Sequence, residues 1–282
     1  MKKIKAAIIF KIENGGRLNV FCRVFCYNQR YLIRNKGKCC EKGEIGFMQR
    51  LKKIEDRIVY EDQQVIVCQK TAGIAVQNAR TGVMDLECAL KNYLAEKNSR
   101  QMPYLGIVHR LDQPVEGLLV FAKTKQAAAD LSRQMARGDM GKYYLAVTLQ
   151  KPAAPEGDLE DYLQKDGKSN SSCVVKKGTS GAKKARLHYR VLQCVREEQS
   201  VTGEKYLISV KLETGRHHQI RVQLANAGIP LAGDRKYNGE EQTEFPLGLC
   251  AWRLEFQHPK TRKKMQFQIF PEGAAFQGFT PE

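Results

Sequence analysis

The sequence lacks any apolar run that approaches the roughly 20 residues a helix needs to cross a bilayer, which excludes an integral helical membrane protein. Its amino end, MKKIKAAIIFK, holds only the apolar stretch AAIIF before Lys11 interrupts it. That stretch is shorter than the roughly 7 to 15 apolar residues at the centre of a secretory signal. We therefore expect a soluble protein in the cytoplasm, with no membrane partner.

Acidic residues are few relative to basic ones, at 30 Asp and Glu against 47 Lys and Arg, giving a formal charge of +17. This excess predicts attraction to polyanions such as nucleic acids or an anionic membrane surface, and indicates nothing about the fold. A basic protein with no polyanionic partner is the alternative. The hydrophobic content of 42% is enough for one large core or two small ones.

Several common motifs of cofactor and metal sites are missing. The chain has no Gly-x-Gly-x-x-Gly after a strand, no Gly-x-x-x-x-Gly-Lys loop and no Gly-x-Ser-x-Gly turn. We therefore expect no cofactor and no nucleotide-driven or hydride chemistry. His217 and His218 are adjacent rather than spaced as helical metal ligands, so we interpret them as ordinary polar residues of a helix and expect no metal.

The nine cysteines are an odd number without a framework spacing, which indicates buried or free thiols in a reducing compartment. Four of them, Cys22, Cys26, Cys39 and Cys40, fall in residues 1–56 at a spacing too irregular for a zinc site, so we favour chance. Residues 1–56 also show no clear hydrophobic period. We treat them as an uncertain basic extension, with residues 1–47 in doubt as part of the natural protein, and residues 57–282 as the main domain.

From residue 57 the pattern predicts many short strands and a few helices. We expect strands in IVYEDQQVIVCQK, split by the turn at 61–63, and in YLGIV, GLLVFAK, KYYLAVTL, ARLHYRVLQCV, KYLISVKLET, LGLCAWRLEF and MQFQIF. Residues 150–184 are rich in Gly, Ser, Pro and Lys and are expected to be loops around short elements. Because strands outnumber helices and short turns join many of them, the expected fold class is α+β with a mixed, largely antiparallel sheet.

Three helices are expected. Asp85 caps the first, whose apolar face is Leu86, Ala89, Leu90, Tyr93 and Leu94. Thr124 caps the second, which ends at Gly138 and turns Ala127, Leu131 and Met135 to one side. The third runs from Arg216, with Ile220, Leu224 and Ala227 inward.

Two charged residues lie in apolar surroundings, where an unpaired charge is costly. Asp112 falls in a loop between two expected strands, and Arg221 falls in the third helix. An ion pair between them would keep the carboxylate ionised and oriented, as a nucleophile requires. On periodicity alone, an aspartate capping a turn and an arginine on a solvated helix face are the simpler interpretation.

Four ordered segments add information. VHRLDQPVEGLLVFAKT, KYYLAV, LETGRHHQIRVQLANAGIPLAGDRKYNG and LCAWRLEFQHPKT resemble the successive motifs of the RluA-type RNA pseudouridine synthase family. The resemblance extends from about Ile58 to about Phe270. It implies the pseudouridine synthase fold, a sheet flanked by helices and loops around a central cleft. It also implies an isomerase that acts on uridines of ribosomal or transfer RNA without a cofactor.

The resemblance also assigns the catalytic residues. Asp112, in His-Arg-Leu-Asp, would be the nucleophile, Tyr144 would stack on the base and take part in proton transfer, and Arg221 would pair with Asp112. The side chains expected to contact RNA also fall in these motifs: His109, Arg110, Lys142, Arg216 and His218. Arg110 would occupy the space left by a flipped-out nucleotide, or would bind a phosphate at the surface. We expect RNA as the partner and a monomer.

The chain also departs from the family. Glu116 replaces a small polar residue, which brings a carboxylate toward a groove that must hold phosphates, and no S4-type RNA-binding domain is evident in residues 1–56. Two other functions compete with the synthase. A non-catalytic RNA-binding or ribosome-assembly factor would be expected to have lost Asp112, Tyr144 or Arg221, and all three are present. A glycoside hydrolase would need a second carboxylate, for which Glu116 is the candidate.

Overall fold

The structure of the chain is a computed structural model. It describes residues 54–78, 84–97, 103–196, 203–238 and 246–280, together with the strands β1 (Ile9–Lys11) and β2 (Asn19–Phe21). The chain divides into two compact units, residues 1–57 with 77–103 and residues 58–76 with 104–282. The cysteines of the predicted extension lie outside the described residues, so both the zinc question and the boundary at residue 57 stay predictions.

The smaller unit contains the antiparallel pair β1 and β2, the short 3-10 helix η1 (Glu55–Arg57) and the helix α2 (Leu86–Lys97). Asp85 begins α2, because its Oδ1 accepts the backbone N–H of Cys88 at 2.8 Å. The five apolar residues expected on one face of this helix are its buried residues. Both the cap and the apolar face are confirmed.

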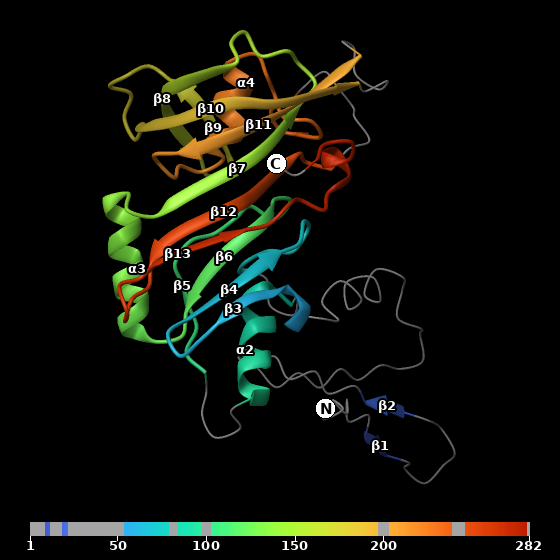
Figure 1. The fold of residues 1–282 in the computed structure, drawn as a ribbon, viewed down its shortest axis with the longest axis vertical. Coiled ribbons are helices and arrows are strands. Elements are labelled where there is room, and N and C mark those ends of the chain that lie inside the picture. Colours follow the sequence, from blue (N-terminus) through green and yellow to red (C-terminus); the bar gives the residue numbers. More distant parts are fainter. Residues whose placement is uncertain are drawn as a thin grey trace. The chain divides into compact units, whose positions relative to one another are not determined.

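The larger unit is built on one twisted sheet (Figure 1). Its strands are β3 (Ile58–Glu61), β4 (Val65–Lys70), β5 (Gly106–Ile107), β6 (Glu116–Ala122), β7 (Gly141–Thr148), β8 (Glu156–Asp166), β9 (Ser171–Val175), β10 (Lys183–Arg196), β11 (Glu204–Leu212), β12 (Leu249–Gln257) and β13 (Lys264–Gln268). The spatial order is β3-β4-β6-β12-β7-β11-β10-β8-β9, with β13 beside β12 and β5 beside β6. Among the strands that the structure describes, only β6 and β12 pair in parallel, which confirms the mixed, largely antiparallel α+β fold.

Helix α3 (Lys125–Arg137) covers one part of this sheet (Figure 1). Thr124 caps it by accepting the N–H of Ala127 at 3.1 Å, and Gly138 ends it in the left-handed conformation with φ 78. Ala127 and Leu131 are buried against apolar residues of β4, β6 and β12. Both expected ends of the helix are confirmed.

Helix α4 (Gln219–Asn226) packs against β8 and β9. Val222 joins Leu163 of β8 and Ala185 of β10 in a small apolar cluster. The expected start at Arg216 is wrong, because the backbone at His218 is left-handed and the helix begins one residue later. The expected inward position of Ala227 is also wrong, since Ala227 is exposed while six consecutive residues from Gln219 are buried.

The expectation of loops across residues 150–184 is wrong for much of that segment. The 11 residues of β8 and the 5 of β9 form a hairpin, and β10 begins within the same segment. Strand β8 is exposed or half-buried at every position except Leu163, so it carries little hydrophobic signal of its own. Its position depends on antiparallel pairing with β10 on one side and β9 on the other. Among the helices described, none is long and apolar enough to cross a membrane.

Candidate active site

Asp112 lies in the loop between β5 and β6, as expected, with its side chain 32% exposed. The backbone N–H of Val115 donates to the Asp112 carbonyl at 3.0 Å and closes a turn. A second loop supports this one, because the N–H of Gly73 donates to the Gln113 carbonyl at 2.8 Å and the Gln113 amide donates to the Gly73 carbonyl at 3.1 Å. The carboxylate is therefore carried by a loop that a neighbouring loop holds in place.

Lys70, at the end of β4, joins the loop that carries Asp112 to the loop that carries Gly73. Its ammonium group donates to the carbonyls of Thr71 at 3.1 Å, Ile74 at 2.8 Å and Gln113 at 3.0 Å. The residue is only 1% exposed. Burial lowers the pKa of Lys70 to about 7, and the nearby charges of Asp112 and Glu116 oppose this shift.

Arg221, on α4, approaches Asp112 but bonds mainly to another carboxylate. Its Nη1 lies 3.6 Å from Oδ2 of Asp112, whereas its Nε and Nη2 each donate to Asp234 at 2.7 Å. The Asp234 side chain is fully buried, and the guanidinium group also lies 5.1 Å from the ring centre of Tyr237. The Asp112 contact expected from the sequence is present, yet it depends on a buried bidentate pair that the sequence did not indicate.

His218 is the second side chain that contacts Asp112, with its Nε2 3.4 Å from Oδ2. On the other edge of the ring, Nδ1 lies 2.7 Å from the hydroxyl of Tyr237, and that hydroxyl accepts the backbone N–H of Ser172 at 2.8 Å. The His217 ring stacks on His218 with centres 3.8 Å apart. The interpretation of the two histidines as ordinary helical residues is wrong, because they precede α4 and their rings face one another.

Tyr144 lies on β7 and is buried. Burial first, and the negative charge of Asp112 second, raise the pKa of Tyr144 well above its usual range. The side chain is therefore a neutral phenol at neutral pH. Such a group is better suited to stacking on a nucleobase and to hydrogen bonding than to accepting a proton as a phenolate.

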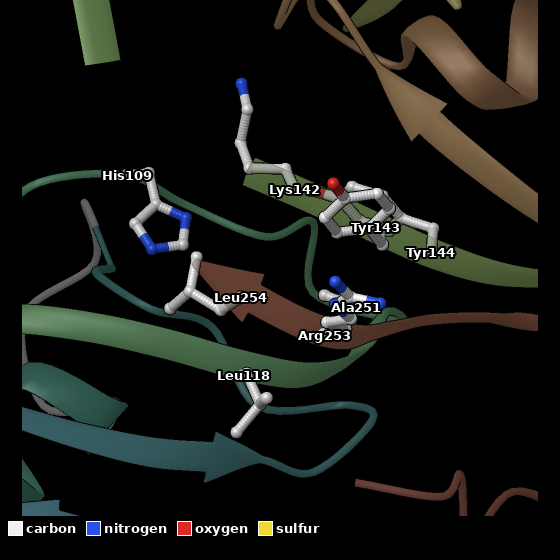
Figure 2. A pocket seen from close by; sticks show the side chains of 8 residues that line it. All are labelled: His109, Leu118, Lys142, Tyr143, Tyr144, Ala251, Arg253 and Leu254. Atoms are coloured by element: carbon white, nitrogen blue, oxygen red, sulfur yellow. The ribbon is translucent and has the colours of Figure 1, made fainter. Parts of the chain in front are cut away.

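A small pocket lies beside Tyr144, over β6, β7 and β12 (Figure 2). It is lined by His109, Leu118, Lys142, Tyr143, Tyr144, Ala251, Arg253 and Leu254. The His109 Nε2 accepts the backbone N–H of Val120 at 3.2 Å, and burial lowers the pKa of His109 to about 3. A neutral His109 thus ties the loop before Asp112 to β6.

Lys142 and Arg216, two expected RNA contacts, lie near one another. Burial, and then the positive charge of Arg216, lower the pKa of Lys142. Arg216 is exposed, and its Nε donates to the carbonyl of Lys184 at 2.9 Å. In Figure 2 the Lys142 ammonium group extends away from the apolar residues of the pocket. Arg110, beside Asp112, is exposed.

Glu116 does not project toward a groove. It is 6% exposed, and its carboxylate accepts the backbone N–H groups of Glu272 at 3.2 Å and Gly273 at 3.0 Å. Burial raises the pKa of Glu116 despite these hydrogen bonds. The expectation that Glu116 brings a carboxylate toward the groove is therefore wrong. Its hydrogen bonds to the carboxy-terminal segment also argue against Glu116 as the second carboxylate of a glycosidase.

Four residues that build the site were given no role by the sequence: Lys70, Ser172, Asp234 and Tyr237. Asp234 and Tyr237 fall inside the motif LAGDRKYNG, so a signal was present, but nothing local indicated their partners. The signal for Asp234 was indirect. A buried arginine requires a carboxylate close by, and Asp112 alone is too exposed to supply it.

Comparison with known proteins identifies the family. The family model for RNA pseudouridylate synthases matches residues 64–226. A ribosomal large subunit pseudouridine synthase D of Nitrosomonas europaea is 36% identical over 224 residues, which is 72% of this chain and 58% of that protein. An uncharacterized RNA pseudouridine synthase of Bacillus subtilis is 35% identical, over 77% of this chain and 70% of that protein. The match thus spans little more than half the length of the first of these relatives.

Solved structures show the same fold. The human RNA pseudouridylate synthase domain containing 4 covers 81% of this chain and 94% of its own at a TM-score of 0.65, with 20% identity. The human RNA pseudouridylate synthase domain containing 1 has a TM-score of 0.61 and 22% identity, over 76% of this chain and 82% of its own. From the family model and the sequence relatives together, the chain belongs to the RNA pseudouridylate synthase family.

Proposed function

We propose that the protein is an RNA pseudouridine synthase that isomerises uridines of ribosomal or transfer RNA, with Asp112 as nucleophile and no cofactor. The observation that carries this proposal is the position of the Asp112 carboxylate. It is partly exposed, it lies on a loop that a neighbouring loop holds in place, and one of its oxygens contacts both Arg221 and His218. The names of the sequence relatives make large-subunit ribosomal RNA the first substrate to test.

The reaction needs few groups. The bond from C1′ to N1 breaks, the base turns, a bond from C1′ to C5 forms, and the hydrogen displaced from C5 is balanced by one gained at N1. Asp112 would attack the ribose, and the guanidinium of Arg221 would hold the carboxylate in position. Tyr144, as a neutral phenol, would stack on the base and offer its hydroxyl oxygen near the hydrogen in transit.

The basic groups near the site support RNA as the partner. Lys142 and Arg216 are like charges held near one another, an arrangement that a phosphate between them would relieve. We propose that these two bind the backbone beside the target uridine, with Arg110 at the exposed edge. His109 would act through the loop, because its Nε2 is already engaged by β6.

The test compares the wild-type protein with Asp112→Asn, which keeps the shape and removes the charge. On ribosomal RNA transcripts the wild type should form pseudouridine at defined sites, and Asp112→Asn should form none while still binding the RNA. Asp139→Asn, an exposed aspartate in the turn after α3, serves as the control and should match the wild type.

The same variants can be followed in cells. Pseudouridine mapping of total RNA should lose specific sites when the protein is absent, and Asp112→Ala should not restore them. If no site changes while the purified protein still binds RNA, the synthase proposal fails and a non-catalytic RNA-binding factor takes its place.

A further inference from the structure

Two groups contact the carboxylate of Asp112, and both contact the same atom. The Nε2 of His218 lies 3.4 Å and the Nη1 of Arg221 lies 3.6 Å from Oδ2. Among the described residues, the other oxygen, Oδ1, has no hydrogen bond or ion pair. One oxygen is therefore held by protein groups, and the second is available to react.

The ring of His218 is fixed on its other edge and on one face. The Tyr237 hydroxyl lies 2.7 Å from Nδ1, and the backbone N–H of Ser172 donates to that hydroxyl at 2.8 Å. The His217 ring covers one face at 3.8 Å. With a side chain only 5% exposed, His218 has little freedom to turn away from Asp112.

The backbone of His218 gives independent support. Its φ of 54 and ψ of 24 lie in the left-handed region, which glycine adopts easily and a histidine adopts at a cost. Non-glycine residues in this region cluster at sites where the side chain is needed. A histidine at the N-cap of α4 that makes no capping hydrogen bond is thus explained by what its ring contacts.

The protonation of the ring follows from its surroundings. Burial lowers the pKa of His218 to about 4; the charge of Asp112 opposes this shift, and Arg221, His217 and Lys236 add to it. The neutral ring carries one hydrogen. Because Tyr237 already accepts from Ser172, its own hydroxyl hydrogen suits Nδ1, which puts the ring hydrogen on Nε2, facing Asp112.

We propose that His218 is a positioning residue for Asp112: its ring, oriented by Tyr237 and Ser172, holds Oδ2 through Nε2 and so directs Oδ1 toward the ribose. This inference rests on the proposed function of Asp112. The residue does not touch the RNA in this role, which replaces the substrate contact expected for it from the sequence.

The first test needs no RNA. Nitrogen-15 NMR of the five histidines, with His218 assigned through His218→Gln, should show a neutral ring with its hydrogen on Nε2 between pH 5.5 and 8. Asp112→Asn should shift the Nε2 resonance, and Tyr237→Phe should move hydrogen toward Nδ1. A charged ring, a hydrogen on Nδ1 in the wild type, or no response to Asp112→Asn would overturn the proposal.

The second test measures turnover. His218→Gly suits the left-handed backbone and leaves space for free imidazole, so kcat should fall by about 100-fold, with little change in KM, and added imidazole should restore part of it. His188→Gln, at a histidine on β10 paired with Asp158, is the control and should keep the wild-type rate. Imidazole should not affect the wild type or rescue Asp112→Asn. An undiminished kcat in His218→Gly, or a loss that imidazole does not reduce, overturns the positioning role. A wild type that forms no pseudouridine overturns the proposed function instead. In that case the NMR experiment still tests the contact between His218 and Asp112.

Discussion

At the scale of single residues, the carboxylate proposed as nucleophile depends on a second, buried carboxylate. Asp112 is partly exposed and is contacted by Arg221, but the two short hydrogen bonds of that arginine go to the fully buried Asp234. Asp234 also accepts the backbone N–H groups of Lys236 at 3.0 Å and Tyr237 at 3.3 Å. One buried carboxylate thus positions both the arginine that contacts Asp112 and the backbone of the tyrosine that contacts His218.

Removing this carboxylate should damage stability and activity together. Asp234→Ala leaves a buried guanidinium group without its main partner, so we expect the free energy of unfolding to fall by about 3–5 kcal/mol. Urea denaturation measures this change, and kcat should fall even at temperatures where the variant is folded.

The control for Asp234→Ala is an ion pair at the surface. Glu160 pairs with Lys184 at 2.7 Å, and both side chains are almost half exposed, so Glu160→Ala should leave the urea midpoint nearly unchanged. Equal effects of the two substitutions would contradict the assignment of Asp234 as the main partner of Arg221.

At the scale of elements, the site depends on how loops and strand ends are joined. Lys70 lies at the end of β4, and its ammonium group binds carbonyls from the two loops that follow β4 and β5. The loop that carries Asp112 is therefore tied to the sheet by a lysine about 40 residues earlier in the chain. The ammonium group at the end of β4 thus joins the two loops to each other and to the sheet.

Lys70→Met tests this connection, because it keeps the length of the side chain and removes its three hydrogen bonds. Leaving the carbonyls of Thr71 and Ile74 without this donor should cost about 1–3 kcal/mol of stability. The Asp112 loop should also loosen, lowering kcat. Hydrogen exchange of the Gly73 and Val115 amides should quicken in Lys70→Met and stay unchanged in Lys151→Met, at an exposed lysine; unaltered exchange in both would argue against the connection.

At the scale of the whole molecule, the charge of +17 favours long-range attraction to RNA, and we expect part of this attraction to act at Lys142 and Arg216. Lys142 and Arg216 lie near one another beside Tyr144, while other basic groups are already engaged. Lys184 pairs with Glu160, and Arg262 pairs with Asp130 at 2.8 Å. The net charge therefore overstates the number of basic side chains that are available to bind phosphates.

The salt dependence of RNA binding reports on the contacts between basic side chains and phosphates. If Lys142 binds one phosphate, Lys142→Ala should weaken RNA binding and reduce the slope of log K against log salt concentration by about 1. Lys260→Ala, at an exposed lysine in the turn between β12 and β13, should change the slope less. An unchanged slope for Lys142→Ala would remove it from the RNA contacts.

The sequence by itself determined the features that depend on neighbours along the chain. The apolar face of α2, both ends of α3 and the loop position of Asp112 follow from side-chain spacing, capping groups and turn residues, all of which act within a few positions. The antiparallel character of the sheet followed from short turns between strands. The family followed from four ordered motifs.

Only the tertiary structure decided which distant groups meet. Strand β8 is too exposed to show a hydrophobic pattern, so pairing with β9 and β10 defines it. The partnership of Arg221 with Asp234, the place of Lys70 beneath the Asp112 loop and the contact of His218 with Asp112 join segments that only folding brings together. Burial removes water from these charges and polar groups, so each must find its partner in space, wherever along the chain that partner lies.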